Sequence, residues 1–221
     1  MRFGVTLAAV GLTGAMLAGC GERVEWHQKL TVEVETPDGI VTGESVMRIN
    51  VRNDPEILAH QVTLVRRVAG EAAFVELRPG SYLFALLADE AKRALYAFEL
   101  NTMAEGHMAG YVALEKMHGA RVLPRENYPR LVTFGHVGSP QTVRRVDPDN
   151  LATSFGPGYR LKSITLEITD APVTRGEVET VLGWLDEYYD KKLDGRRYET
   201  IEAENRLANS LASGAFDTER N

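Results

Sequence analysis

Two alternating segments on either side of one turn constrain the fold of this chain most. Residues 30–34 alternate apolar with polar side chains, and so do residues 47–51. A period of two gives a strand one apolar face and one polar face. Pro37-Asp38-Gly39 lies between them, and it favours a turn because proline fixes one dihedral angle and glycine accepts a positive φ. We predict an antiparallel hairpin, with Gly43 as a candidate bulge.

Strand patterns return at several later positions. We place further strands at residues 61–68, 72–77, 131–134, 142–146 and 162–168. The apolar run 82–87 fits either a buried strand or the start of a helix, because it is too short for periodicity to decide.

Helical signals are clearest in the last third of the chain. Thr174-Arg175-Gly176-Glu177 fits a capping box, and an apolar stripe from Val178 to Tyr189 follows it. This pattern predicts a long amphipathic helix near 175–192 that ends before Gly195.

Three shorter helical segments are also predicted. Apolar spacing predicts a helix from Asp89 to about Asn101. Asp147-Pro148 predicts the start of a short helix ending at Phe155, because aspartate caps a helix and proline suits its first position. Residues 198–211 form another amphipathic segment.

These elements predict an α+β fold, with N-terminal antiparallel strands and a hairpin before a mixed strand and helix part. We expect a short tether over residues 20–27, a single domain over 28–212 and a frayed tail over 213–221. A division into two lobes near 103–130 is the alternative.

The start of the chain has the pattern of a secretory signal peptide. Arg2 precedes an apolar run over residues 3–16, and small residues follow. A membrane-spanning helix is the weaker interpretation, because crossing the bilayer takes about 20 apolar residues and this run contains glycine and threonine.

Leu17-Ala18-Gly19 followed by Cys20 resembles the lipobox of bacterial lipoproteins. The resemblance implies a signal peptide over residues 1–19, cleavage between Gly19 and Cys20, and lipid attachment at Cys20. Two or three acyl chains would anchor the protein stably. Gly21, not aspartate, follows the cysteine, which by the same resemblance implies the outer membrane, facing the periplasm. An incidental cysteine after an ordinary signal peptide is the alternative.

The rest of the chain resembles uncharacterised proteins of proteobacteria over about half its length. The resemblance implies one coherent module and transfers no activity and no catalytic residue. It is carried by residues 30–43, 129–135, 146–149, 155–158, 166–170 and 184–185.

Composition excludes several classes of function. The formal net charge of −6 gives no reason to expect a nucleic-acid partner. Cys20 is the only cysteine, so its lipidation would leave no thiol for a disulfide, a cysteine-ligated metal or cysteine catalysis.

No metal, catalytic or cofactor-binding residue is predicted. His107 and His118 lack the spacing of a helical metal pair. Asp147 and Asp149 with Asn150 are not followed by the loop of a calcium-binding hand.

Catalytic serine signatures are missing from the sequence as well. Ser45, Ser139 and Ser154 do not lie in Gly-x-Ser-x-Gly. Glu167 and Asp170 are candidate paired carboxylates, although sequence does not fix their separation.

Arg121, Arg125 and Arg130 with Tyr128 form a candidate anion or glycan pocket. A solvated face is the simpler interpretation of these charges, as it is of Arg66-Arg67 and Arg144-Arg145.

We expect a lipid-anchored, periplasm-facing envelope protein with a binding or scaffold role, which contacts the membrane through its lipid and binds an envelope protein. A periplasmic hydrolase acting on cell-wall or lipid substrates, with a site from the region 121–136, is the alternative. An inhibitor or immunity-type lipoprotein is a second alternative. A histidine in a cleft near a serine or carboxylate would favour the hydrolase, and a flat or apolar patch would favour a protein partner.

Overall fold

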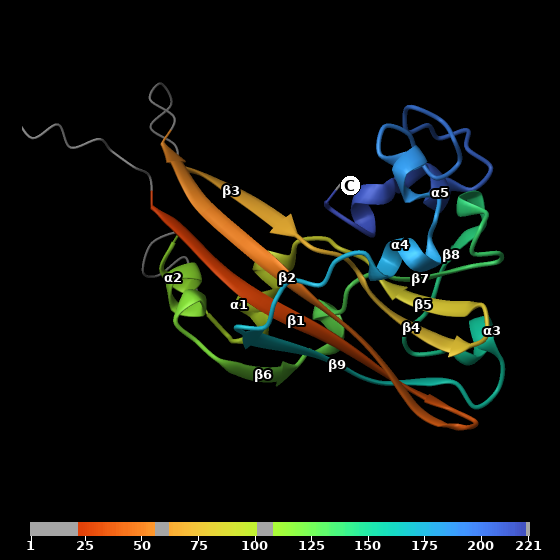
Figure 1. Ribbon diagram of the computed structural model, residues 1–221, viewed down its shortest axis with the longest axis horizontal. Coiled ribbons are helices and arrows are strands. Elements are labelled where there is room, and N and C mark those ends of the chain that lie inside the picture. Colours follow the sequence, from red (N-terminus) through yellow and green to blue (C-terminus); the bar gives the residue numbers. More distant parts are fainter. Residues whose placement is uncertain (1–21, 56–61, 101–107, 220–221) are drawn as a thin grey trace, which may run out of the picture.

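The computed structural model describes residues 22–55, 62–100 and 108–219. It shows a mostly-β protein with two antiparallel sheets and a few short helices (Figure 1). The expected strands are therefore present, and the large helical contribution implied by an α+β fold is not.

The predicted hairpin is confirmed and forms the centre of the larger sheet. β1 (Arg23–Thr36) pairs antiparallel with β2 (Gly39–Pro55), and only Pro37 and Asp38 lie between them. Gly39 has a φ of 125°, which explains why glycine follows the turn. Since β1 begins at Arg23, the expected tether over residues 20–27 is too long.

The larger sheet has the strand order β3-β2-β1-β9-β6. Its remaining strands are β3 (Val62–Ala69), β9 (Arg160–Thr169) and β6 (Gly119–Val122). The smaller sheet has the order β4-β5-β7-β8, with β4 (Ala73–Arg78), β5 (Ser81–Ala85), β7 (Leu131–Phe134) and β8 (Val143–Arg145). The ambiguous run 82–87 is thus largely strand β5. Strands from before and after residues 103–130, where two lobes were the alternative, share both sheets.

Gly43 allows the two sheets to approach each other, and it does not mark a bulge. The β1–β2 register continues through the pair Val32↔Gly43. A Cβ atom at Gly43 would lie 1.7 Å from the backbone oxygen of Phe74 on β4. The glycine therefore leaves room for a neighbouring strand.

Both faces of the smaller sheet contribute to a hydrophobic core. One face packs in a core with the larger sheet and the helices α1 (Glu90–Ala97) and α2 (Ala109–Glu115). Its other face contributes Phe84, Val132 and Val143 to a second core with the C-terminal segment. Figure 1 shows this segment, with α4 and α5, beside β4, β5, β7 and β8.

The prediction of a long helix near 175–192 is wrong. These residues form α4 (Glu177–Val181) and a separate 3-10 turn over Leu185–Tyr188. Leu182 leaves the helical conformation with a ψ of 63°, and Trp184 then enters the second core, where its Nε1 donates to the carbonyl of Val137 at 2.8 Å. A continuous helix would place Trp184 beside the apolar stripe, not within it, so burial of the indole outweighs the local period.

Other helices are shorter than predicted. The helix expected from Asp89 is α1 and ends at Ala97, and the described residues stop before Asn101. Asp147 does not begin a helix, because its Oδ1 and its carbonyl accept bonds from Asp149 and Asn150 in a turn. The helix that follows is α3 (Ala152–Phe155), and the segment 198–211 forms only α5 (Arg206–Ser210).

The tail expected to fray over 213–221 is packed as far as it is described. Ser213 and Phe216 are fully buried. Ala72 donates its backbone N–H to the carbonyl of Phe216 at 2.7 Å, and Thr218 bonds both backbone groups of Gly70. The C-terminal segment is therefore part of the fold, because its aromatic side chain completes the second core.

Candidate binding pocket beside α1

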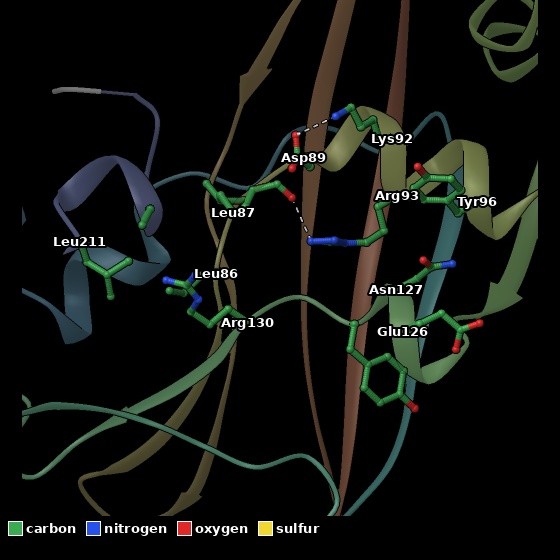
Figure 2. Close-up of a pocket in the computed structure, with 13 residues that line it drawn as sticks. Leu86, Leu87, Asp89, Lys92, Arg93, Tyr96, Glu126, Asn127, Arg130 and Leu211 are labelled. Atoms are coloured by element: carbon green, nitrogen blue, oxygen red, sulfur yellow. Dashed lines mark hydrogen bonds and ion pairs between the residues drawn. The ribbon is translucent and has the colours of Figure 1, made fainter. Parts of the chain in front are cut away.

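A pocket of about 440 Å³ opens between α1, the link that precedes it and the chain before β7 (Figure 2). This volume lies within the range of small-molecule sites, about 300–1,000 Å³. The polar lining residues are Asp89, Lys92, Arg93, Tyr96, Glu126, Asn127, Tyr128 and Arg130, and Leu86, Leu87, Ala88, Leu211 and Ala215 supply the rest.

A buried ion pair fixes one wall of this pocket. Glu90 is 1% exposed and Arg93 is 8% exposed. The Nη2 atom of Arg93 lies 3.2 Å from Oε1 of Glu90 and donates to the carbonyl of Ala88 at 2.9 Å. Burial raises the pKa of the Glu90 carboxyl, and the charge of Arg93 opposes that rise.

The ion pair is tied to the central strand of the larger sheet. Gln28 on β1 is fully buried, and its Nε2 lies 3.4 Å from both the carbonyl and the carboxylate of Glu90. Its Oε1 accepts a bond from Trp26 Nε1 at 3.0 Å. This network holds the start of α1 against the sheet, because a buried polar group that is left without a hydrogen-bond partner destabilises the folded protein.

The residue before α1 has an unusual backbone conformation. Asp89 has a φ of 51°, in the left-handed region, and its carbonyl accepts the backbone N–H of Arg93 at 3.0 Å. Aspartate tolerates this region better than most side chains. The sharp entry into α1 places Asp89 and Lys92 together at the rim, 3.9 Å apart.

The pocket keeps hydrogen-bonding capacity that the protein itself does not use. Within the described part of the chain, the buried Nε atom of Arg93 has no hydrogen-bond partner. Arg130 lies next to Leu86, whose N–H donates to the Arg130 carbonyl at 3.0 Å, and the Arg130 side chain is exposed. Lys92, Arg93 and Arg130 all line this cavity (Figure 2), with Lys92 beside Asp89 and Arg93 paired with Glu90.

The arginine cluster predicted from sequence is only partly assembled. Arg130 and Tyr128 line the pocket. Arg121 instead lies over the ring of Phe98, with its Cζ 5.2 Å from the centroid. Arg125 pairs with the carboxylate of Asp149 at 2.9 Å, so two of the three predicted arginines interact elsewhere.

The histidine and carboxylate candidates lie at a different place. His118 Nε2 is 2.9 Å from the carboxylate of Asp170, beside a smaller cavity of about 200 Å³. Both side chains are open to solvent, 63% and 92% exposed. Glu167 pairs with Lys29 at 2.8 Å and does not form a carboxylate pair with Asp170. A surface pair of this kind lacks the desolvated setting that activates a catalytic base.

The three candidate serines make structural hydrogen bonds. Ser45 is buried and donates to the carbonyl of Glu71 at 2.7 Å. Ser139 and Ser154 make backbone turn contacts near β8 and α3. Among the described residues that line the two cavities above, none is a serine or a cysteine.

Several predicted sites are outside the described residues. Gly19, Cys20 and His107 all fall there. In the ranges that are described, no three His, Cys, Asp or Glu side chains are arranged to hold a metal ion.

Sequence reasoning missed the residues on α1. Lys92 and Arg93 look like solvated charges, because Glu90 and Arg93 have the i, i+3 spacing common on exposed helix surfaces. Burial of that pair follows from the contact with Gln28, 62 positions earlier in the chain, and no local pattern encodes it.

No helix in the described part of the chain is both long enough and apolar enough to cross a membrane. Comparison of the chain with protein-family models, curated proteins and solved structures finds no match.

Proposed function

We propose that this protein is a lipid-anchored binding protein of the bacterial envelope, attached to the outer membrane and facing the periplasm. The lipobox Leu17-Ala18-Gly19-Cys20 carries the proposal. Only Gly21 and Glu22 separate Cys20 from β1, so a lipid on Cys20 would hold the folded part next to the bilayer.

The pocket beside α1 supports a role in binding. One wall is fixed by the Gln28–Glu90–Arg93 network, and a lining that combines apolar side chains with a few convergent polar groups is typical of ligand sites. A hydrolase of the nucleophilic type would need a serine, threonine or cysteine beside a base. The described residues that line the pocket beside α1 contain no such pair.

Mass spectrometry of the full chain purified from envelope membranes tests the anchor. We expect wild-type protein to start at Cys20 and to carry the mass of acyl chains. A Cys20→Ser variant should carry none, because serine cannot form the thioether. A wild-type protein that retains residues 1–19 and carries no acyl mass would refute the proposal.

Fractionation of inner and outer membranes tests the location. The wild-type protein should fractionate with the outer membrane. Gly21→Asp should move it to the inner membrane, because the resemblance to bacterial lipoproteins implies that aspartate after the cysteine retains the protein there. Glu22→Gln, a matched change one residue later, should leave the location unchanged. Wild-type protein in the inner membrane would contradict the proposed side.

A further inference from the structure

We propose that the pocket beside α1 binds an acidic carbohydrate, meaning a sugar or cyclitol that carries one carboxylate or phosphate group. The inference rests on the proposed function as a binding protein, and it names the class of ligand for that site.

The cations of the pocket select the acidic group. Arg93 lines the pocket with a side chain that Glu90 and Ala88 hold in place, and its buried Nε has no hydrogen-bond partner among the described residues. Arg130 and Lys92 add two charges that solvent can reach. A fixed guanidinium binds carboxylate or phosphate well, because its N–H groups match two oxygens and little conformational freedom is lost on binding.

The carboxylates of the pocket limit the ligand to one strongly anionic group. Asp89 and Glu126 line the same cavity, and each would repel a second anion close to it. Carboxylate oxygens accept hydrogen bonds from hydroxyl groups, and the Asn127 amide can donate and accept. A ligand with several hydroxyls and one acid satisfies both sets of residues.

An aromatic side chain at the rim fits a sugar ring. Tyr96 on α1 is 61% exposed although it is large and aromatic, and it lines the pocket near Arg93 and Asn127 (Figure 2). The lining also contains the apolar side chains of Leu86, Leu87 and Leu211. Sugars present C–H groups on the faces of the ring and hydroxyls at its edge, which matches a lining of mixed apolar and polar side chains.

Calorimetric titration of three sugars with the same ring tests the ligand class. The full chain is purified in a neutral detergent and titrated with glucose, glucuronate and glucose 6-phosphate at about 0.1 M salt, where long-range charge effects are screened. We expect glucuronate or glucose 6-phosphate to bind at least about tenfold more tightly than glucose, because only they carry an acidic group that the basic side chains of the pocket can bind. The proposal would be overturned if glucose bound as tightly as every acidic probe. It would also be overturned if no acidic probe bound, including the lipid-headgroup probe described below.

Exposed pocket residues give variants that should fold normally. Arg130→Gln should weaken binding of the acidic sugar about tenfold and leave glucose binding unchanged. Arg144→Gln is the matched control, because Arg144 is an exposed arginine on β8 outside the pocket. An equal loss in both variants would contradict the assigned site.

The same titration distinguishes two sources of the acidic ring. Glycerophosphoinositol represents a lipid headgroup, and glucuronate and glucose 6-phosphate represent free glycans. Tighter binding of one group, lost in Arg130→Gln, supports the pocket and identifies the source. If no acidic probe binds while Cys20 is lipidated, the ligand class fails and the anchor proposal stands. If acidic probes bind while Cys20 carries no lipid, the anchor fails and the ligand class stands.

Discussion

The carboxylate of Glu71 accepts a hydrogen bond from the backbone N–H of Val178 at 3.2 Å, so a residue between β3 and β4 caps the amino end of α4. Its other oxygen accepts the N–H of Glu177 at 3.2 Å. The sequence pattern assigned this capping to Thr174. Thr174 instead bonds both backbone groups of Val46 on β2, and the cap is therefore a tertiary contact.

Replacing Glu71 should destabilise the protein more than replacing the glutamate predicted to form the capping box. Glu71→Ala leaves two backbone donors of α4 unpaired, and we expect a loss of about 1–2 kcal/mol at neutral pH. Glu177→Gln should cost less than about 0.5 kcal/mol, because Glu177 is exposed. Urea unfolding measures both, and a larger cost for Glu177→Gln would restore the local capping box.

The stability of the protein should increase as the pH falls from about 8 to about 5. Burial raises the pKa of Glu71, Glu90 and Asp217 above their ordinary values of 4.5, 4.5 and 3.8. The folded protein then binds protons that the unfolded chain has already released. This stabilisation is complete below the ordinary values and is lost as the pH rises through the raised values.

Urea midpoints at pH 5 and pH 7.5 test this pH dependence. Glu90→Gln should reduce the difference between the two midpoints, because it removes one of the three groups. Glu33 and Glu219 act in the opposite direction, since hydrogen bonds lower the pKa of each, but their effect lies below pH 4.5. A midpoint that increases steadily from pH 5 to pH 8 would contradict the prediction.

Strands were predictable because their signal is local. The turn Pro37-Asp38-Gly39 and the period of two around it located β1 and β2, and alternation also located β9. The break in the predicted long helix could not be foreseen from the sequence, because it depends on where Trp184 is buried. Trp184 packs at 5.8 Å from Phe134 and 5.9 Å from Phe216, measured between ring centroids, and both partners are far away in sequence.

The candidate pocket shows the same limit. Arg130 and Tyr128 were proposed from a cluster in one loop. Arg93 was not, because its burial arises from α1 docking on β1 through Gln28. Sequence reasoning identified charged loops, and only the fold shows which of their charges face one cavity.

Gly43→Ala should be severely destabilising although it adds one methyl group. The added Cβ would overlap the backbone oxygen of Phe74, which a side-chain rotation cannot relieve. We expect a loss of about 3 kcal/mol or more in urea unfolding. Gly183→Ala is the matched control, because its Cβ meets no atom within 4 Å. Equal stability of the two variants would show that the sheets do not approach at Gly43.

Phe216→Ala tests whether the C-terminal segment belongs to the folded core. Phe216 is fully buried, and its ring lies 5.7 Å from Phe84 on β5. Truncating a buried phenylalanine costs about 3–5 kcal/mol, because it leaves a cavity in a packed core. Tyr198→Ala should cost under about 1 kcal/mol, since Tyr198 is 72% exposed. Urea unfolding compares the two variants. In the wild type, amide hydrogen exchange should show protection at Phe216, because its backbone N–H donates to the carbonyl of Ser213. A frayed tail would instead give a small cost for Phe216→Ala and rapid exchange at that amide.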